Sequence, residues 1–533
     1  MTRVLIRCDA SQIIGTGHVM RCRAVALALQ ARGAEVVFLC RRQPGDQIEQ
    51  LAEEFRVLNL PACRQPEARS ARSAPLRGRT LYASWLGCSE QQDAHDCLTA
   101  LAAASLDRPS WLVVDHYGLA APWQRLMQAG LAQVAILVID DLADRRHHAT
   151  VLMDANRVAV ADVDPYRDLV PEACTTLLGP PYALLNSIYS RLQPVLPARV
   201  QLSRVLVSFG GVDLANHTAM ALEALNHPRL RHLSLDVVLG AGAPHLAELE
   251  ARVQRRPHTS LHVGLPSLAG LMARADLALG AAGTTSWERA CVGLPAVVVP
   301  VAENQNQGAR ALEASGVARC LDLQAAPDPV KALQRAVLDL LDAPGALRAM
   351  SEACLQLGDG RGLARVVAAL LGPVAGLMLR PAQAADLWLY HWWANDPQVR
   401  RQSFNSEPIP LEQHRRWFGG RLGSSLALMR VLEDGQGLPL GQIRLEREAV
   451  DSPRAVVGFS LDRLARGRGL AAPLLQLGLA ELARCWGPAM EVYGEVRAEN
   501  PSSCKAFLRA GFKEGPPARP GVRCFARTAL QDP

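Results

Sequence analysis

A histidine after a short glycine-bearing loop is the first group in the chain suited to acid–base chemistry. Val4 to Ile6 predict a strand, and Gly15, Gly17 and His18 follow before an apolar pattern typical of a helix. Glycines at such a turn let the chain bend tightly and open backbone N–H groups to an anionic ligand. A histidine at the rim titrates near neutral pH and can accept a proton from water. The loop is a candidate site for an anion and a general base.

The same pattern has a plainer interpretation. Glycine-punctuated turns from strand to helix occur in parallel α/β folds for packing alone, and a histidine at a helix start can simply form a capping hydrogen bond. The spacing by itself favours this interpretation, so the functional one needs further support.

That support is a resemblance. Residues 7–22, RCDASQIIGTGHVMRC, look like the signature of the UDP-2,4-diacetamido-2,4,6-trideoxy-β-L-altropyranose hydrolases of pseudaminic acid biosynthesis, which are relatives of two-domain GT-B glycosyltransferases. The similarity extends over roughly the first two thirds of the chain. It implies that His18 is the base that activates water, with Asp9 beside it in the catalytic set. It also implies that Gly15, Gly17 and Arg21 contact the substrate.

Composition narrows the class of protein. The chain has 533 residues, 49% of them hydrophobic and 20% charged, which indicates several ordered domains. A formal charge of +6 without a long basic run suits nucleotide phosphates better than nucleic acid. The 13 cysteines show no paired CxxC spacing, so we expect reduced thiols and no metal. No segment suggests secretion or membrane spanning, and we expect a cytoplasmic protein.

Two further strands of the first half end in polar residues. Residues 111–115 and 134–141 are apolar stretches with carboxylates at their ends, where ligands gather in open parallel sheets. Candidates for the cleft of His18 are therefore Asp115, His116, Tyr117, Asp140 and Asp141. For Asp140 and Asp141 the alternative is capping of the next segment and charge balance with Arg145 and Arg146, and we prefer it for Asp141. For Asp115 and His116 we leave both interpretations open.

A second nucleotide-binding pattern follows residue 204. Gly211 lies after the strand 205–209, where backbone N–H groups can face phosphate. Residues 280–288, GAAGTTSWE, combine a glycine turn, hydroxyl donors and a carboxylate about one helical turn later. This order resembles the donor-nucleotide site of GT-B enzymes. The resemblance assigns Gly283, Thr284 and Thr285 to the diphosphate, Glu288 to the ribose, and Asn304 and Gln305 to the sugar. The alternative is that Glu288 is a solvated helix residue and that Asn304 and Gln305 belong to an ordinary loop.

The last third has the order of a different family. Residues 466–471, RGRGLA, follow a strand and precede a helix, and they match the R/Q-x-x-G-x-G/A loop of the GNAT acetyltransferases. Successive amides at such a helix start can receive the pyrophosphate of coenzyme A, with arginines adding charge. The cofactor residues implied are Arg466, Gly467, Arg468, Gly469, Leu470, Ala471 and Asn500.

One position departs from that family. Many of its members carry a tyrosine five residues before the phenylalanine that corresponds to Phe512, where it protonates the thiolate, and Phe507 stands there. Because phenylalanine donates no proton, the general acid is another group, a water, or absent. Glu446, Tyr493 and Glu495 are open alternatives.

The sequence thus predicts an α/β protein with a GT-B-type pair of Rossmann-like lobes, 1–198 and 199–372, and a GNAT domain, 373–533. By resemblance it is a bifunctional enzyme that acetylates the 4-amine of a UDP-amino sugar with acetyl-CoA and hydrolyses the UDP product. Its partners would be the UDP-sugar and acetyl-CoA, with no nucleic acid and no membrane. The alternatives are a glycosyltransferase fused to an acetyltransferase, and a nucleotide-sugar sensor with a decayed domain.

Overall fold

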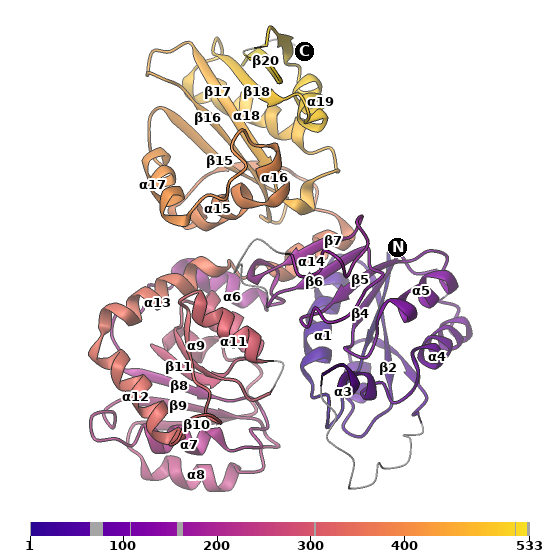
Figure 1. Ribbon diagram of the computed structural model, residues 1–533, viewed down its shortest axis with the longest axis vertical. Coiled ribbons are helices and arrows are strands. Elements are labelled where there is room, and N and C mark those ends of the chain that lie inside the picture. The colour runs from indigo at the N-terminus through magenta and orange to yellow at the C-terminus, as the bar shows by residue number, and fades with distance from the viewer. Residues whose placement is uncertain are drawn as a thin grey trace. The chain divides into compact units, whose positions relative to one another are not determined.

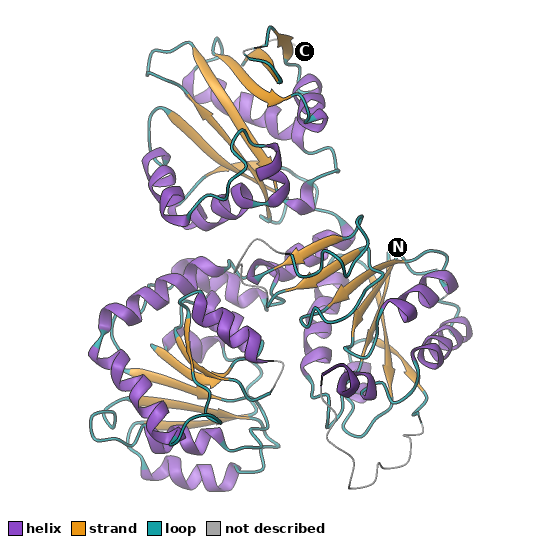
Figure 2. Ribbon diagram, viewed as in Figure 1, coloured by secondary structure: helices purple, strands orange, loops and turns teal. Residues whose placement is uncertain are grey.

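The computed structural model describes residues 2–63, 78–106, 108–156, 164–302, 305–517 and 519–529. The chain divides into two compact units, Met1–Val367 and Ala368–Pro533. The first unit contains two parallel sheets flanked by helices, and the second contains one mixed sheet (Figures 1 and 2). The predicted fold class, two Rossmann-like lobes followed by a GNAT-type α+β domain, is confirmed. The predicted boundaries at residues 198 and 372 stay predictions.

The first sheet has the strand order β3-β2-β1-β4-β5-β6-β7, and all its neighbours are parallel. Its strands are β1 (Arg3–Cys8), β2 (Glu35–Arg41), β3 (Arg56–Leu60), β4 (Trp111–Asp115), β5 (Ala135–Ile139), β6 (Val151–Asp154) and β7 (Thr175–Leu178). The helices among them are α1 (Gly17–Gln30), α2 (Ile48–Ala52), α3 (Gly78–Ser84), α4 (Glu90–Ala103) and α5 (Ala121–Gly130). The short helices η1 (Pro180–Tyr182), α6 (Ser187–Leu192) and η2 (Gln193–Val195) lead on from β7.

The second sheet repeats this plan, with the order β10-β9-β8-β11-β12-β13 and parallel neighbours throughout. Its strands are β8 (Arg204–Ser208), β9 (Ser234–Leu239), β10 (Thr259–Val263), β11 (Leu277–Ala281), β12 (Ala296–Val299) and β13 (Ala318–Cys320). The helices are α7 (His217–Ala224), α8 (Leu246–Arg255), α9 (Ala269–Arg274), α10 (Thr285–Cys291), α11 (Gln305–Ala314), α12 (Pro329–Asp342), α13 (Pro344–Leu357) and α14 (Gly362–Leu371).

Continuous apolar strands explain why both faces of the second sheet are buried. Along β8, Val205 and Val207 belong to one core cluster and Leu206 to the other, and β12 alternates in the same way. A strand that is apolar at every position needs cover on both faces, which helices provide in parallel sheets.

The order of each parallel sheet fixes where a ligand can bind. In both sheets, the direction in which successive strands are added reverses beside the first strand of the lobe, between β1 and β4 and between β8 and β11. Ligands of open parallel sheets bind outside the carboxyl ends of strands at such a switch point. The loops after β1 and β4, and those after β8 and β11, therefore meet at the two predicted sites.

The sheet of the second unit is mixed, with the order β14-β15-β16-β17-β18-β20-β19. Its strands are β14 (Met378–Pro381), β15 (Ala427–Glu433), β16 (Pro439–Glu446), β17 (Arg454–Leu461), β18 (Glu491–Arg497), β19 (Lys513–Gly515) and β20 (Val522–Thr528). Its helices are η3 (Ala384–Asp386), α15 (Leu387–Asn395), α16 (Pro397–Gln402), α17 (Leu411–Arg421), η4 (Arg463–Ala465), α18 (Ala471–Trp486) and α19 (Pro501–Arg509). The parallel strands β17 and β18 pair only over their first residues, Arg454–Val456 with Glu491–Tyr493, and then part. This separation opens a gap in the sheet.

Two remaining expectations concern loops and membranes. Residues 64–80 are rich in Arg, Ser, Pro and Ala, which predicts a surface loop. Residues 64–77 lie outside the described part, and the last residues of this stretch instead begin α3 at Gly78. Within the described ranges, no helix has the length and apolar character needed to cross a bilayer.

Candidate functional site

The base predicted at residue 18 is held by a carboxylate from a neighbouring strand. His18 lies in the first turn of α1, and its Nδ1 is 2.6 Å from Oδ1 of Asp115 at the end of β4. Strands β1 and β4 pair so that Cys8 lies beside Asp115, which places that carboxylate next to the loop after β1. His18 is 8% exposed and Asp115 is fully buried. The structure thus brings together His18 and Asp115, which the sequence left open.

This pairing determines which ring nitrogen of His18 can act. A carboxylate only accepts hydrogen bonds, so Nδ1 carries the proton that Asp115 accepts, and Nε2 keeps its lone pair. Arg21 also lies near Nδ1, at 3.2 Å through Nη2, but the carboxylate is the closer partner. A histidine oriented in this way presents Nε2 as a base.

The side chain of Arg21 forms hydrogen bonds with two carboxylates of the protein at this site. Its Nε and Nη2 donate to the two oxygens of Asp115 at 2.5 and 2.6 Å, and its Nη1 donates to Asp141 at 3.4 Å. Burial alone would raise the pKa of Asp115, but the charge of Arg21 and the bonds from Arg21 and His18 hold it well below its usual range. Asp115 is therefore a charged, fixed partner for His18. The substrate contact predicted for Arg21 remains a proposal, and its observed role is to orient Asp115.

Asp9, predicted beside His18 in the catalytic set, lies in a buried network of ions. It is fully buried, and Arg7 donates to both its oxygens, with a 2.8 Å bond to Oδ2. The backbone N–H of Arg41 also donates to it at 2.8 Å, and His116 lies 3.4 Å away. These partners occupy the carboxylate, which supports the end of β1 and the loop that follows. A direct role of Asp9 in chemistry stays a prediction.

The same network makes a stability prediction. Asp93 on α4 is fully buried and accepts from Arg7, Arg41 and the indole of Trp123, at 2.8, 2.7 and 2.9 Å. Asp93→Asn should destabilise the first lobe by about 3 kcal/mol, because two buried guanidinium groups lose a countercharge. Urea unfolding, monitored by hydrogen exchange of peptides from β1 and β2, measures this change in the free energy of unfolding. A matched change at exposed Asp342, whose partner is exposed Arg229, should have a much smaller effect, because water screens this ion pair. Equal effects of the two variants would contradict the prediction.

The two adjacent aspartates after β5 reverse the expected roles. Asp140 forms an ion pair with Arg145, whose Nη2 lies 2.7 Å from its Oδ1, and its Oδ2 accepts from the backbone N–H groups of Leu142 and Ala143. The capping and charge balance that we preferred for Asp141 therefore belong to Asp140. Asp141 instead faces Arg21 and accepts from Nδ2 of Asn156 at 3.1 Å. The preference for Asp141 was wrong because two neighbouring residues after a strand point to opposite sides.

Aromatic rings form one wall beside the base. Tyr117 meets the His18 ring edge-on with centroids 4.6 Å apart, and Trp85 stacks on Tyr117 at 5.5 Å. Tyr82 packs edge-on against the rings of both Trp85 and Tyr117. Tyr82 and Trp85 come from α3 and the turn after it, a stretch that sequence reasoning missed. The only available signal was aromatic content beside an otherwise polar loop.

In the second lobe, the turn after β11 carries the residues predicted to hold diphosphate. Gly283 precedes Thr284, which caps α10 with its backbone, and Thr285 begins that helix. Gln305 at the start of α11 lies beside Gly283, where an added Cβ would meet its Nε2 at 3.8 Å. The structure thus brings Gly283 and Gln305 together. Asn304 lies outside the described residues.

The loop after β8 lies beside the loop after β9. Gly210 has a φ of +104°, a conformation that glycine adopts readily. The carbonyl of Gly211 accepts from the N–H of Gly240 at 2.9 Å, and a Cβ on Gly240 would come within 2.4 Å of that oxygen. The loop after β8 stands at the switch point between β8 and β11, and the loop after β9 borders it. The assignment of Gly211 to substrate stays a prediction.

Glu288, predicted to bind ribose, has a partner in the protein. Tyr189 on α6 forms a hydrogen bond with it, and Tyr189 is 2% exposed. Burial raises the pKa of Glu288, and the bond to Tyr189 and the charge of Arg289 offset this only in part. Glu288 is therefore a desolvated carboxylate at the edge of the turn, and its ribose contact remains a proposal.

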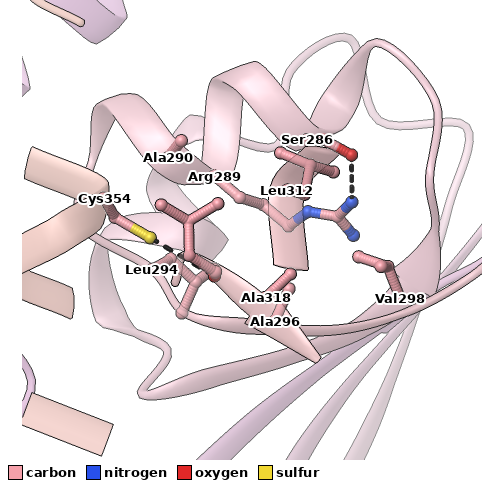
Figure 3. A pocket seen from close by; sticks show the side chains of 10 residues that line it. Ser286, Arg289, Ala290, Leu294, Ala296, Val298, Leu312, Ala318 and Cys354 are labelled. Carbon is pink, nitrogen blue, oxygen red and sulfur yellow. Dashed lines mark hydrogen bonds between the residues drawn. The ribbon is translucent and has the colours of Figure 1, made fainter. Parts of the chain in front are cut away.

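Arg289 lies directly beneath this turn. It is 3% exposed, and its Nη2 donates to the carbonyl of Ala281 at 2.7 Å. The same nitrogen donates to Oγ of Ser286 at 2.8 Å (Figure 3). Burial lowers its pKa to about 10, so it stays charged at neutral pH. The small cavity that it lines has room for about one water, too little for a nucleotide. This cavity is therefore not a nucleotide site.

In the C-terminal unit, the glycine loop has the predicted shape. Gly467 and Gly469 have φ values of +72° and +77°, and Leu470 precedes α18, which starts at Ala471. Arg466 donates to Asp396 at 2.8 Å through Nη1, while its buried Nη2 has no partner among the described residues. Arg468 donates to the carbonyl of Leu464 at 2.9 Å. The two arginines are thus partly engaged by the protein.

Two other predicted positions serve local structure. Asn500 caps α19, accepting from the N–H of Ser503 at 3.1 Å. Phe507 is 3% exposed and stacks on Phe525 with centroids 5.2 Å apart. An added Cβ on Gly494 would come within 2.5 Å of the Phe507 ring, so the glycine makes room for it. Phe507 is a core residue, and the coenzyme contact of Asn500 stays a prediction.

A buried histidine in this unit makes its stability depend on pH. His414 on α17 is 3% exposed, and its Nε2 has no partner among the described residues. Burial, aided by His391 and Arg444, lowers its pKa from 6.5 to about 4. Because the folded state prefers the neutral ring, this stability is present above pH 6.5 and is lost as the pH falls toward 4.

Between pH 7 and pH 5, protonation of His414 in the unfolded chain should therefore lower the free energy of unfolding by about 2 kcal/mol. His414→Phe should remove that part of the decrease. Hydrogen exchange of α17 and β15 peptides in the full chain measures it in both proteins, and the remaining histidines cancel in the difference. Identical pH slopes for the two proteins would refute the assignment.

Two regions of the chain match known families. Residues 206–362 match the family described as "Glycosyltransferase family 28 C-terminal domain", and residues 376–513 match "Acetyltransferase (GNAT) domain".

Curated relatives are distant. The spore coat polysaccharide biosynthesis protein SpsG of Bacillus subtilis (strain 168) is 27% identical over 146 residues, which are 27% of this chain and 43% of that protein. The UDP-2,4-diacetamido-2,4,6-trideoxy-beta-L-altropyranose hydrolase of Campylobacter jejuni is 23% identical over 270 residues, 51% of this chain and 81% of that one. An uncharacterized protein of Methanocaldococcus jannaschii is 20% identical over 528 residues, 96% and 97% of the two chains.

Two solved structures each align with part of the chain. MurG of Acinetobacter baumannii aligns with a TM-score of 0.46 at 16% identity, covering 69% of this chain and 98% of MurG. Spermidine N-acetyltransferase from Vibrio cholerae in complex with CoA and spermine aligns with a TM-score of 0.26 at 19% identity, covering 29% and 95%. The chain therefore joins a pair of Rossmann-like lobes, which contain a region similar to glycosyltransferase family 28 C-terminal domains, to a GNAT acetyltransferase domain.

Proposed function

We propose that this chain is a bifunctional nucleotide-sugar enzyme of pseudaminic acid biosynthesis. The GNAT domain acetylates the 4-amine of UDP-4-amino-4,6-dideoxy-N-acetyl-β-L-altrosamine with acetyl-CoA. The two lobes then hydrolyse UDP-2,4-diacetamido-2,4,6-trideoxy-β-L-altropyranose to the free sugar and UDP. The reactions are consecutive, which gives the fusion a chemical reason.

The observation that carries the hydrolase proposal is the 2.6 Å contact between His18 Nδ1 and Asp115. It fixes the imidazole with Nε2 as the free base, at the rim of a loop that stands at the switch point of the first sheet. The similarity to the Campylobacter hydrolase adds support for this class of reaction, at 23% identity.

In the proposed hydrolysis, the base and the UDP leaving group act on opposite sides of the anomeric carbon. His18 Nε2 takes a proton from water, and the water oxygen forms a bond to the anomeric carbon while the bond from that carbon to the phosphate oxygen breaks. UDP leaves with the electron pair. Amides and hydroxyls at residues 283–285 would stabilise the charge that develops on the diphosphate. The attack from the opposite side predicts inversion at the anomeric carbon.

Acetyl transfer uses the gap where β17 and β18 part. An uncharged amine attacks the thioester carbonyl, the bond to sulfur breaks, and the amine loses a proton. The amides of the 466–471 loop would hold the pyrophosphate of the coenzyme. Because Phe507 is an apolar core residue, the group that protonates the thiolate is drawn from Tyr493, Glu446, Glu495 or a water.

A second candidate rests on the match of residues 206–362 to a glycosyltransferase family. The same nucleotide site could serve transfer of the sugar to an acceptor hydroxyl. The two functions differ in product when no acceptor is present, because only a hydrolase then releases free sugar.

An NMR time course with UDP-4-amino-4,6-dideoxy-N-acetyl-β-L-altrosamine, with and without acetyl-CoA, tests the proposal. We expect a new N-acetyl signal that depends on acetyl-CoA, followed by release of UDP and free sugar. Acetylation without UDP release would support the GNAT part and shift the first unit toward a transferase. No reaction in either mixture would refute the proposed substrate.

A further inference from the structure

A continuous series of hydrogen bonds links the His18–Asp115 pair to the helix of the predicted nucleotide site. From Asp115 it passes to Arg21, from Arg21 to Asp141 at 3.4 Å, and from Asp141 to Nδ2 of Asn156 at 3.1 Å. The Oδ1 of Asn156 then accepts from the indole Nε1 of Trp287 at 2.8 Å. Trp287 lies on α10, one residue before Glu288. Both ends belong to the first compact unit.

We propose that Asn156 and Asp141 are positioning residues that couple nucleotide binding at α10 to the alignment of His18. This inference deepens the proposed function and rests on it. None of these residues needs to touch the sugar, because they act through Arg21 on Asp115 and through Asp115 on the imidazole.

The amide of Asn156 fits this place for a specific reason. Trp287 Nε1 can only donate, and the Asp141 carboxylate can only accept. The bridge between them must therefore offer one acceptor and one donor, and the amide oxygen and nitrogen of Asn156 do so in a single orientation. The N–H of Asn156 also donates to Oδ1 of Asp154 at 2.8 Å, which fixes the residue to the end of β6.

Because these residues are largely buried, the loss of one hydrogen bond in the series affects the side chains next to it. Trp287 is 5% exposed, and the side chains of Arg21 and Asp141 are 15% and 12% exposed. In such surroundings a broken bond leaves a polar group without water to replace its partner, so the next side chain shifts to find one. Asp141 also faces the hydroxyl of Tyr117, whose ring packs on His18. A change at Asn156 thus reaches the base by two routes.

Trp287→Phe is the sharpest test, because it keeps an aromatic ring on α10 and removes the indole donor. Asn156→Ala removes the bridge itself. We expect each variant to lower kcat of hydrolysis about tenfold with KM within about twofold, the result of losing alignment rather than binding. The double variant should be no slower than the worse single one, since both break the same connection.

Trp393→Phe is the matched control. The indole of Trp393 donates to Asp462 at 2.8 Å and is equally buried, but it lies in the GNAT domain. This variant should leave hydrolysis unchanged. Loss of hydrolysis in all three variants alike would indicate general destabilisation and overturn the inference.

Hydrogen exchange with UDP as the probe tests coupling without chemistry. In the unmodified protein, UDP should protect peptides over residues 283–292 and also α1 and the end of β4. In Trp287→Phe, protection should persist at 283–292 and be lost from α1. Protection of 283–292 alone in the unmodified protein would overturn the coupling and leave the nucleotide site in place. Protection of neither segment would remove the proposed nucleotide site, and the inference with it.

Discussion

His18→Ala should slow release of UDP from the diacetylated nucleotide sugar by about 10²–10⁴-fold, the usual contribution of a positioned general base. The physical reason is local. His18 Nδ1 is held by Asp115, so Nε2 is the nitrogen available to take a proton from water, and alanine offers none. UDP binding, measured by calorimetry, should change little, because the predicted diphosphate contacts come from the second lobe. Acetyl transfer by the other unit should keep its rate.

His262→Ala is the control for this variant. His262 also forms a pair with a buried aspartate, through Nε2 to Asp236 at 2.9 Å, but it lies on β10, away from the switch point of its sheet. Its loss should leave hydrolysis unaffected. A His18→Ala protein that hydrolyses at the parent rate would remove the base assignment, and a His262→Ala protein that fails equally would point to folding instead.

Gly469→Val should abolish acetyl transfer and weaken coenzyme A binding by about 10²-fold, while hydrolysis of a supplied diacetylated substrate continues. Gly469 has a φ of +77°, where a β-branched residue is strained by about 1–3 kcal/mol. The chain would relieve that strain by turning the amides of the 466–471 loop away from one another. Isothermal titration with coenzyme A and a thiol-release assay measure the two losses.

Gly423→Val carries the same strain at another place in the same unit. Its φ is +79°, and, as at Gly469, no atom lies within 4 Å of an added Cβ. It stands between α17 and β15, so it should cost a similar amount of stability and leave coenzyme A affinity nearly intact. If both variants lose affinity equally, backbone strain rather than the loop explains the result, and the pyrophosphate assignment falls.

Several features could be predicted from the sequence because they depend on neighbours along the chain. The strand before Asp9, the turn at Gly15 and the helix at His18 follow from apolar runs and glycine positions. The order of strand, glycine loop and helix at residues 466–471 was predicted in the same way. The fold class followed from the repetition of such units together with the resemblances to GT-B enzymes and to the GNAT family, and it is confirmed.

The partners of charged side chains could not be predicted in this way. The family resemblance assigns Arg21 to the substrate, and the structure shows that it also binds Asp115, 94 residues away. Asp140 and Asp141 are neighbours with the same side chain, and only the direction of each Cβ separates a capping residue from one that faces Arg21. Asn500 and Arg466 likewise meet protein partners that the glycine loop and the helix start do not reveal.

The sequence by itself determined that His18 stands at the rim of a glycine loop after a strand, and that a glycine turn precedes Glu288. Only the tertiary structure decided that Asp115 holds His18 and that Trp287 bonds to Asn156. The first depends on local backbone preferences, which act over a few residues. The second depends on strand order and register, which place β4 beside β1 and bring together side chains that lie far apart in the chain.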